Sequence, residues 1–289
     1  MQSVLVTGCS SGFGLLAAVT LARNGFRVFA SMRDLEKRAP LEAALSAAGA
    51  RAELLTLDVT NAASIAAAVA AVVARAGRID ALVNNAGFGI GGFVEDMTLE
   101  EYRRQFDTNF FGTVAVTKAV LPQLRRQGAG RICMVSSIAG RAANPVISAY
   151  AASKFALEGF SEALAFEARL FGVDIVLIEP GTFKTEIFAG NRQLAAAARD
   201  PASPYFALSR AVEAKVDAIV ARHGGEPQKV ADAILKALTV RRPRLRYLVG
   251  TDAKLAAGLH RFGGLELYAA AVRRVLGIGD LADKLRPAR

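Results

Sequence analysis

The stretch Thr7-Gly8-Cys9-Ser10-Ser11-Gly12-Phe13-Gly14 decides the fold. It follows an apolar run at residues 4–7 that is typical of a buried strand, and it leads into a helical pattern at residues 14–24. Glycines let a chain turn sharply and pass close to a pyrophosphate, whose charge a helix N-terminus stabilises. The Gly-x3-Gly-x-Gly spacing therefore favours a dinucleotide-binding turn over a plain tight connection between a strand and a helix.

Short β-branched or leucine-rich runs alternate with longer alanine-rich helical patterns on both sides of this turn, as in βαβ units. The runs are continuously apolar, which indicates a sheet covered by helices on both faces. Right-handed crossovers then predict an α/β fold with a doubly wound parallel sheet of about seven strands. The predicted strands are 4–7, 27–31, 52–57, 81–84, 131–136, 173–178 and 245–249, and the predicted helices are 14–24, 35–48, 63–76, 99–127 and 150–171.

The chain has 289 residues, of which 53% are hydrophobic, so it buries a substantial core and is neither disordered nor a disulfide-stapled mini-protein. Its length alone allows two domains, but no linker-like stretch and no internal repeat divides it. We therefore predict one dinucleotide-binding and catalytic domain at residues 1–250, with a helical extension at residues 251–289 packed on it. Residues 182–226 are too long for a simple connection and are predicted to form a substrate lid.

The net charge is +10, and its excess is a C-terminal feature, since residues 241–289 contain 11 basic and 4 acidic residues. Leucines and aromatic residues stand among these arginines. Such an amphipathic tail has three possible places: on an anionic membrane surface, over the substrate cleft, or on the core as a solvated helix pair. Nucleic acid is not an expected partner, because no basic and aromatic face of a known reader is present.

Cys9 and Cys133 lie far apart in apolar, strand-like contexts, so neither a disulfide framework nor a metal site is expected. The first residues run straight into a strand without the pattern of a secretory leader. The most apolar stretch, residues 62–74, is too short to span a bilayer. These features predict a cytoplasmic location.

The end of the second predicted strand reads Ala30-Ser31-Met32-Arg33. Many dinucleotide folds carry an acidic residue here for the ribose 2′-hydroxyl. Arg33 would instead bind a 2′-phosphate, so NADP(H) is favoured over NAD(H), which stays possible. The alternative is that Arg33 is an ordinary solvated arginine.

Ser137 precedes Tyr150 by 13 residues, and Lys154 follows Tyr150 by four. Positions four apart share a helix face, so the Lys154 ammonium should lie beside the Tyr150 phenol and lower its pKa. Tyr150 then becomes a usable general acid and base, with the Ser137 hydroxyl binding the substrate oxygen. Tyr-x3-Lys alone occurs by chance on many helices, so its weight comes from the surrounding motifs.

Together these motifs resemble the short-chain dehydrogenase/reductase family over residues 3–249. Their order and spacing agree with the family pattern, which implies a Rossmann fold with the strand order 3-2-1-4-5-6-7 and NAD(P)-dependent oxidoreductase activity. The family also dimerises through its long fourth and fifth helices, so a homodimer is implied. The matching stretches are Thr7-Gly8-x3-Gly12-x-Gly14, Leu57-Asp58-Val59, Asn84-Asn85-Ala86-Gly87, Asn109, Ser137, Tyr150-x3-Lys154 and Pro180-Gly181-x3-Thr185.

The resemblance implies a catalytic set of Asn109, Ser137, Tyr150 and Lys154, in which Asn109 positions a water that links Lys154 to solvent. Asp58 would bind the adenine, and Thr185 would fix the nicotinamide carboxamide. In isolation, Asp58 could equally cap a turn and Asn109 could be a buried amide. The implied cofactor-binding residues are Gly8, Ser10, Ser11, Gly12, Phe13, Gly14, Arg33, Asp58, Val59, Asn84, Ala86, Gly87, Tyr150, Lys154, Pro180, Gly181, Phe183 and Thr185.

Within the family, the chain is most similar to 17-beta-hydroxysteroid dehydrogenases and retinol dehydrogenases. In that subgroup, the residues at Ser10 and Arg33 clamp the 2′-phosphate. The lid and the tail depart from the subgroup. The stretches that carry the likeness are Thr7 to Gly12, Ala30 to Leu35, Ala152 to Gly159 and Leu245-Arg246-Tyr247.

The substrate side of the site is predicted to be mostly apolar, which suits a bulky hydrophobic alcohol or ketone better than a sugar. Its predicted residues are Phe88, Val94, Ser137, Ile138, Tyr150, Phe183 and Phe188, although the lid aromatics could serve plain packing. We thus expect an NADP(H)-dependent oxidoreductase that acts on a steroid-, retinoid- or long-chain-carbonyl-like substrate. The alternative is a non-catalytic dinucleotide sensor or scaffold on the same fold.

Overall fold

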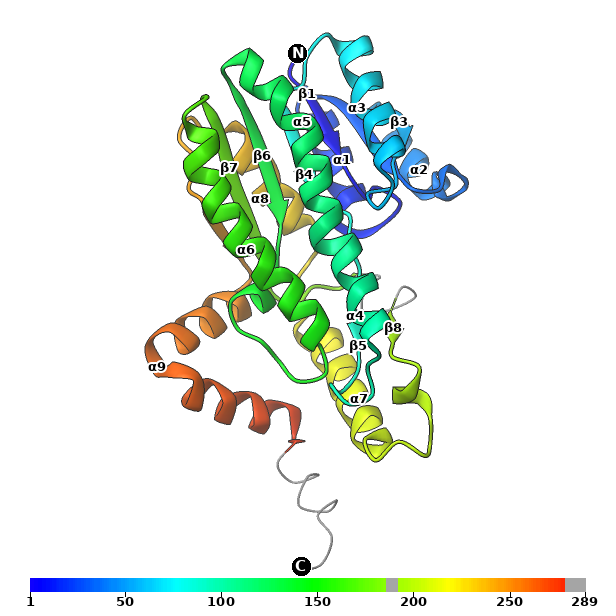
Figure 1. Ribbon diagram of the computed structural model, residues 1–289, viewed down its shortest axis with the longest axis vertical. Helices are drawn as coiled ribbons and strands as arrows, with labels where there is room; N and C mark the ends of the chain where they lie inside the picture. Colours follow the sequence, from blue (N-terminus) through cyan, green and yellow to red (C-terminus); the bar gives the residue numbers. More distant parts are fainter. Residues whose placement is uncertain (186–191, 279–289) are drawn as a thin grey trace, which may run out of the picture.

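A seven-stranded parallel sheet organises the computed structural model, which describes residues 1–185 and 192–278 (Figure 1). The strands lie in the order β3-β2-β1-β4-β6-β7-β9, and every neighbouring pair is parallel. By chain order within the sheet this is 3-2-1-4-5-6-7, so the predicted order is confirmed. The strands are β1 (Ser3–Val6), β2 (Arg27–Met32), β3 (Glu53–Thr56), β4 (Ala81–Asn84), β6 (Gly130–Val135), β7 (Val173–Pro180) and β9 (Arg246–Val249).

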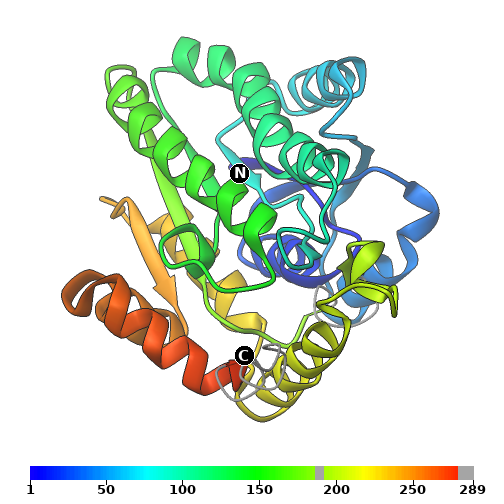
Figure 2. The same cartoon turned by 60° about the horizontal axis from the view of Figure 1, so that its bottom comes forward.

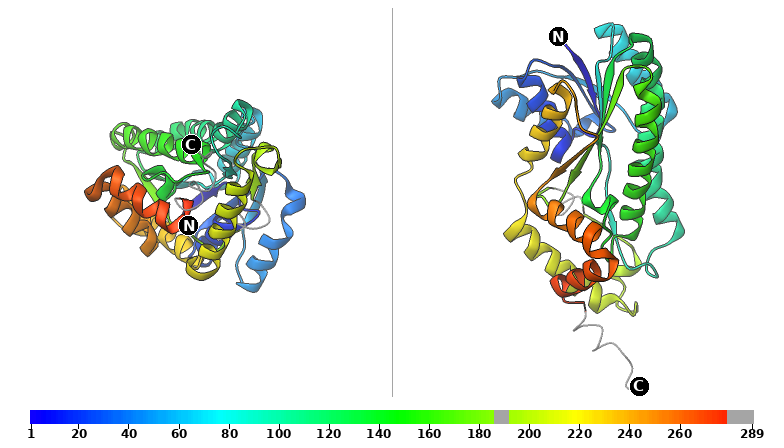
Figure 3. Two further views of the ribbon diagram at one scale, coloured as in Figure 1. Left: turned by 90° about the horizontal axis from the view of Figure 1, so that it is seen from below. Right: turned by 90° about the vertical axis from the view of Figure 1, so that its left-hand side faces the viewer.

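Helices cover both faces of the sheet, as the continuously apolar strands predicted (Figure 3). Along β1, Val4 and Val6 join one core cluster and Leu5 joins the other, because successive side chains of a strand point to opposite faces. One face packs against α1 (Gly12–Arg23), α2 (Ala39–Ala47) and α8 (Gln228–Thr239), and the other against α3 (Ala62–Ala76), α5 (Thr113–Gln127) and α6 (Ser148–Arg169).

Local signals set where several helices begin and end. The Asn61 side chain caps α3 by accepting a hydrogen bond from the Ser64 amide at 3.0 Å. The next helix, α4 (Leu99–Phe106), begins with a capping box formed by Thr98 and Glu101. Helix α5 ends at Gly128, whose φ of 65° is in the left-handed region that favours glycine.

Three parts of this architecture differ from the sequence expectation. The single helix predicted at 99–127 contains a π-helical stretch, η2 (Asp107–Gly112), between α4 and α5. A second, two-stranded sheet pairs β5 (Ile90–Gly91) with β8 (Gln193–Leu194), and such short strands show no alternation that could predict them. Helix α8 was not predicted either.

Helices α7 (Phe206–His223) and α9 (Thr251–Leu276) lie beyond the carboxyl ends of the strands (Figures 1 and 2). The predicted lid at 182–226 contains β8, the short helix η5 (Ala197–Arg199) and α7. Helix α9 forms the predicted helical extension, with a kink at Gly264, where φ is 72° and ψ is 176°. Within the described ranges, no helix combines the length and the apolarity that crossing a membrane requires.

Candidate active site

The carboxyl ends of β1, β4, β6 and β7 meet at one edge of the sheet, where α/β proteins place their ligands. The turn after β1 has two glycines in the left-handed region, Gly8 at φ 72° and Gly12 at φ 57°. A Cβ on Gly14 would lie 2.2 Å from the Gly8 carbonyl oxygen and 2.4 Å from Asn85 Nδ2. The first turn of α1 therefore passes directly over the backbone of the turn, which only glycine at position 14 allows.

Thr7 and Asn85 fasten this turn to the end of β4, and neither was among the predicted site residues. Thr7 Oγ1 accepts hydrogen bonds from the backbone amides of Asn85 at 2.9 Å and Ala86 at 3.0 Å. Asn85 Nδ2 donates to the carbonyl oxygens of Thr7 at 2.9 Å and Gly8 at 3.1 Å. Their signal in the sequence is position: each directly follows the last residue of a buried strand.

A dinucleotide fits the residues around this turn. The N-cap of α1 is Ser11, whose side chain makes no capping hydrogen bond, and the positive end of the helix dipole points out over the turn. Ser10 and Phe13 are partly exposed beside it. Arg33 follows β2 and is exposed, and within the described residues its guanidinium has no hydrogen bond or ion pair. The turn thus offers backbone hydrogen-bond donors, which a pyrophosphate requires. Arg33 offers a cation, which the phosphate of a phosphorylated ribose requires.

The predicted adenine-side residues are partly committed to other contacts. Asp58 Oδ1 accepts hydrogen bonds from the Thr60 amide at 2.9 Å and the Thr60 hydroxyl at 2.7 Å, so Asp58 shapes the turn before α3. Val59 is buried against Gly112. The Asn84 side chain donates to Thr117 Oγ1 at 2.9 Å, so it bridges β4 and α5. The place of Asn84 in the cofactor site stays a prediction.

Ser137, Tyr150 and Lys154 lie together at the end of β6, as predicted. Ser137 caps the short helix η3 (Ile138–Gly140), accepting from the Ala139 amide at 3.1 Å, and it also hydrogen-bonds Tyr150. Lys154 Nζ donates to the Val135 carbonyl oxygen at 2.8 Å and lies 5.7 Å from the centre of the Tyr150 ring. The Ser137 hydroxyl and the Lys154 ammonium therefore both lie beside Tyr150.

The pKa of Tyr150 differs from the expectation drawn from the sequence. Burial raises the pKa of Tyr150 above its usual value, and the Ser137 hydrogen bond opposes this only in part. Burial also lowers the pKa of Lys154 to about 8, against the attraction of Glu158. The predicted lowering of the Tyr150 pKa by Lys154 is thus not seen, because loss of hydration dominates both groups. Tyr150 stays a protonated acid at neutral pH.

Asn109 lies in the π-helical stretch and is 1% exposed. Its Oδ1 accepts from the Phe88 amide at 3.1 Å, and its Nδ2 donates to the Phe88 carbonyl oxygen at 2.9 Å. A second contact of Nδ2, to Ser153 Oγ at 3.4 Å, reaches the helix of Tyr150. Gly87 lies against this amide, since a Cβ there would be 3.1 Å from Asn109 Oδ1. Asn109 is thus a buried, hydrogen-bonded amide in contact with the Tyr150 helix, and its role in a water relay stays a prediction.

A cavity of about 850 Å³ opens beside Tyr150 and extends between α7 and α9. Its walls are mostly apolar, as predicted for the substrate side. Four predicted substrate residues line it: Ser137, Ile138, Tyr150 and Phe183. Further walls come from the predicted lid and from the C-terminal extension, with Val212, Val216 and Ile219 from α7 and Leu259, Val272 and Leu276 from α9. Of the three places considered for the tail, α9 thus lies over the cavity.

Phe88 and Val94 were predicted to contact the substrate, but neither side chain is part of the lining of this cavity. The Phe88 ring packs beside Ile90 and under the Arg104 guanidinium, 5.8 Å from its centre, so the backbone of the following glycines faces the cavity instead. Val94 is 68% exposed on the loop after β5. The remaining predicted residue, Phe188, lies outside the described residues.

The segment after β7 joins the cofactor side to the cavity. Pro180, Gly181 and Thr185 line the cavity beside Phe13, as the predicted nicotinamide end requires. Phe183 is 1% exposed and packs edge-to-face on Phe13, with ring centres 5.7 Å apart. This segment is tied to α9 by an unpredicted residue, Asp252, whose Oδ2 accepts from the Thr182 amide at 2.6 Å. Asp252 therefore couples the cavity wall to the strand that carries the predicted nicotinamide contacts.

Comparisons with known proteins identify the family of this chain. The family model described as short chain dehydrogenase matches residues 2–195. The uncharacterized oxidoreductase YusZ of Bacillus subtilis is 44% identical over 257 residues, which cover 87% of this chain and 90% of YusZ. Bovine retinol dehydrogenase 8 is 40% identical, covering 86% of this chain and 82% of its own length. Rat estradiol 17-beta-dehydrogenase 1 is 38% identical, covering 84% and 72%.

Solved structures share the fold over most of the chain. A short-chain dehydrogenase from Streptomyces avermitilis has a TM-score of 0.77 at 34% identity, covering 99% of this chain and 98% of its own. Actinorhodin polyketide ketoreductase with NADPH has a TM-score of 0.72 at 31% identity, covering 86% and 95%. A Burkholderia phymatum enzyme of this type in complex with NAD scores 0.77 at 28% identity, covering 92% and 94%. A nicotinamide dinucleotide is thus the cofactor that the comparisons support.

Replacing Thr7 tests the fastening of the glycine turn. The isosteric change Thr7→Val leaves two backbone amides without their acceptor, so we expect the free energy of unfolding to fall by about 1–3 kcal/mol. Thr7→Ser keeps the hydroxyl, so its free energy of unfolding should fall much less. Urea unfolding of the three proteins measures the difference; equal losses in the valine and serine variants would show that the two hydrogen bonds do not hold the turn.

Proposed function

Because the chain belongs to the short chain dehydrogenase family, close to retinol dehydrogenase 8 and estradiol 17-beta-dehydrogenase 1, we propose that it is an NADP(H)-dependent oxidoreductase of hydrophobic alcohols and ketones. The proposal rests on one arrangement: Ser137 and Tyr150 line a mostly apolar cavity, Lys154 lies beside Tyr150, and the glycine turn nearby fits a dinucleotide. NADPH supplies the hydride in the reductive direction.

The residues of this chain would manage the oxygen and its proton. The Ser137 hydroxyl binds the carbonyl oxygen of the substrate and orients it toward Tyr150. Tyr150 donates its phenolic proton as the alcohol forms, which its raised pKa permits at neutral pH. The Lys154 ammonium then stabilises the phenolate that develops, because an opposite charge nearby favours the ionised form. Oxidation follows the same steps in reverse.

The cofactor would extend from the glycine turn to the end of β7. The backbone of Gly8 to Gly14 and the N-terminus of α1 would bind the pyrophosphate, and Ser10 and Arg33 the 2′-phosphate. Asp58, Val59 and the backbone of Asn84 to Gly87 would line the adenosine. Pro180, Gly181, Phe183 and Thr185 would hold the nicotinamide beside Tyr150 and Lys154.

The substrate class follows from the cavity. A volume of about 850 Å³ with mostly apolar walls suits a bulky hydrophobic carbonyl compound and gives a sugar few hydrogen-bond partners. The names of the relatives retinol dehydrogenase 8 and estradiol 17-beta-dehydrogenase 1 support a steroid-, retinoid- or long-chain-carbonyl-like substrate. A cytoplasmic location remains part of this proposal.

Two surfaces suggest partners. Helix α9 carries exposed apolar side chains, among them Phe262 at 84% and Leu265 at 66%, and also Arg261, Arg273 and Arg274, a composition that suits weak contact with an anionic membrane. Exposed apolar side chains on η2, on α6 and on the two residues after α6 suit a homodimer surface. Its residues are Phe111, Phe155, Phe166, Leu170 and Phe171.

The dimer is tested by light scattering at micromolar concentration, where we expect twice the mass of the chain. The double change Phe166→Glu and Leu170→Glu places two charges in the surface on α6, and it should yield monomers because charges are costly to bury. The matched change Phe262→Glu with Leu265→Glu on α9 should leave the mass unchanged. A monomeric wild-type protein would contradict the dimer.

Tyr150→Phe tests the general acid. Removing the phenolic hydroxyl should lower kcat/KM for ketone reduction by about 10²- to 10⁴-fold, since that is the usual contribution of general acid–base catalysis. Tyr247→Phe, on β9 and outside the cavity lining, is the control and should keep full turnover. Unchanged turnover in Tyr150→Phe would exclude the proposed mechanism, and cofactor binding without any turnover in the wild type would favour the sensor or scaffold.

Arg33→Ala tests the cofactor preference. Loss of a charge-assisted contact worth about 1.5–3 kcal/mol should weaken NADPH binding by roughly 10- to 100-fold and leave NADH binding nearly unchanged. Arg38→Ala, which removes an arginine paired with Glu42, is the control and should affect neither cofactor. Fluorescence titrations measure all affinities; a wild type that prefers NADH would contradict the role of Arg33.

A further inference from the structure

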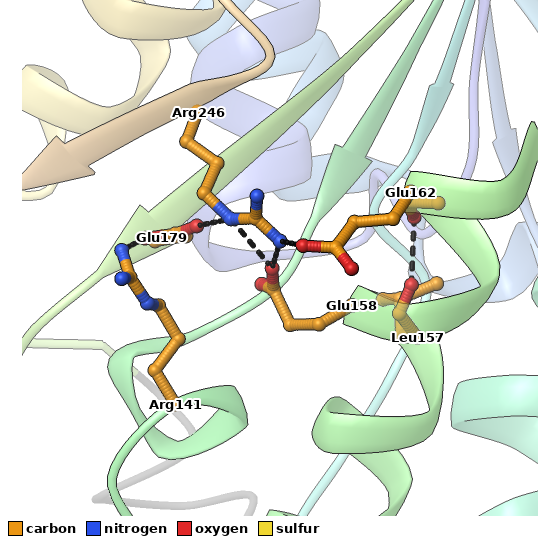
Figure 4. A network of polar contacts seen from close by, with 7 residues as sticks. Arg141, Leu157, Glu158, Glu162, Glu179 and Arg246 are labelled. Carbon is orange, nitrogen blue, oxygen red and sulfur yellow. Dashed lines mark hydrogen bonds and ion pairs between the residues drawn. The ribbon is translucent and has the colours of Figure 1, made fainter. Parts of the chain in front are cut away.

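Five charged side chains form a partly buried cluster between α6 and the strands β7 and β9 (Figure 4). They come from four separate parts of the chain: the end of η3, helix α6, strand β7 and strand β9. We call them the Arg246 cluster. Its members are Arg141, Glu158, Glu162, Glu179 and Arg246.

Arg246 is the centre of the cluster. Its Nη2 lies 3.0 Å from Glu158 Oε2 and 2.7 Å from Glu162 Oε1, and its Nε lies 2.9 Å from Glu179 Oε1. Arg141 Nη1 closes the cluster at 3.3 Å from Glu179 Oε2. Glu179 is 0% exposed and Glu158 is 6% exposed, so these charges act through protein rather than water.

The cluster is continuous with the catalytic segments. Glu158 follows Lys154 by four residues, so the two side chains share a face of α6. Gly140 brings the segment of Ser137 against both, since a Cβ there would lie 3.0 Å from Glu158 Cγ and 3.0 Å from the Lys154 carbonyl oxygen. Glu179 directly precedes the Pro180-Gly181 segment of the cavity wall.

Lys154 needs a negative charge close by. It is 6% exposed, and its one described hydrogen bond goes to a neutral carbonyl. Lys154 contacts Tyr150 on α6 and the Val135 carbonyl at the end of β6, and Asn109 of η2 reaches the same helix by its hydrogen bond to Ser153. None of these groups is anionic at neutral pH. The anionic side chains come from the Arg246 cluster.

Glu158 is the member placed to supply that charge. Arg246 contacts Glu158 through Oε2, whereas Oε1 is buried and has no hydrogen-bond donor among the described residues. The attraction of Glu158 opposes the burial that lowers the Lys154 pKa to about 8. Glu179 is less available, because burial and the repulsion of Glu158 raise its pKa to about 7, against the pull of Arg141 and Arg246.

We propose that Glu158 is a positioning residue that keeps the Lys154 side chain in its ammonium form, and that Arg246, which pairs with Glu158, tempers its charge. The inference rests on the proposed function for its catalytic consequence: Tyr150 acts as an acid only while a cation beside it stabilises the phenolate. A merely structural cluster would join α6 to β9 without influencing the protonation of Lys154.

The pH dependence of ketone reduction tests this inference. In the wild type, kcat/KM should fall at alkaline pH as Lys154 loses its proton. Glu158→Gln removes one negative charge and keeps the size of the side chain, so the alkaline limb should move down by about one pH unit. Glu158→Asp restores the charge and should return the limb toward the wild-type position.

Glu162→Gln is the matched control. It removes the same charge from the same helix and a contact with the same arginine, but the Glu162 side chain is 52% exposed and solvent screens it. The alkaline limb of its pH profile should stay within a few tenths of a pH unit of the wild-type position. Equal shifts in Glu158→Gln and Glu162→Gln, or no shift in either, would overturn the proposal.

Arg246→Gln provides a second test with the opposite sign, and it decides the matter if Glu158→Gln does not fold. Removing the cation that tempers Glu158 strengthens the attraction on Lys154, so the alkaline limb should move up. A downward shift, or none, would contradict the role of Arg246.

A measurement without substrate separates this inference from the proposed function. The Lys154 pKa is about 8 in the folded chain, below its usual value, so the unfolded chain binds the extra proton and stability rises as the pH increases above 8. The difference between the wild type and Lys154→Met isolates this rise. In the Glu158→Gln background the rise should begin about one pH unit lower. An unchanged onset overturns the inference even if no carbonyl substrate is found, whereas absence of turnover alone would count against the proposed function.

Discussion

The close approach of the first turn of α1 to the end of β1 is the constraint on which the rest of the site depends. Gly14 lies so near the Gly8 carbonyl and Asn85 that no Cβ fits between them. Asn85 and Thr7 then hold the ends of β1 and β4 together by hydrogen bonds. This places a helix N-terminus over the carboxyl edge of the sheet, where its dipole and backbone donors favour an anion.

Burial then sets the chemistry at the end of the next strands. Loss of hydration disfavours both the Tyr150 phenolate and the Lys154 ammonium, so a neutral pair would be the default in this position. An acid that remains protonated suits carbonyl reduction, but the phenolate left after proton transfer still needs a cation. The Arg246 cluster supplies the compensating negative charge from the side of α6 that faces β7 and β9. The fold thus couples the charge of the Arg246 cluster to the chemistry of Tyr150 and Lys154, because α6 carries both Lys154 and Glu158.

The sequence predicted the sheet, its order and the convergence of Ser137, Tyr150 and Lys154, since each depends on local signals: apolar runs, a glycine turn and a four-residue helical spacing. It did not predict the π-helical turn that brings Asn109 onto the Phe88 backbone, because one extra residue in a turn barely disturbs the apolar pattern of a helix. Phe88 and Val94 were misplaced because a two-residue strand, β5, fixes which side of the loop faces the cavity. The direction of the Tyr150 pKa was misjudged because sequence spacing reports neighbours and not burial.

The proposed function depends on direct hydride transfer between a nicotinamide and a hydrophobic carbonyl compound in the cavity beside Tyr150. To follow this transfer, the protein is incubated with NADPH that carries deuterium at C4 on each face in turn, together with a panel of steroid, retinoid and long-chain ketones, and the products are analysed by mass spectrometry. We expect an alcohol with deuterium on its carbinol carbon from one labelled face only. Products without deuterium from either face, or no product from any ketone while NADPH binds, would contradict it.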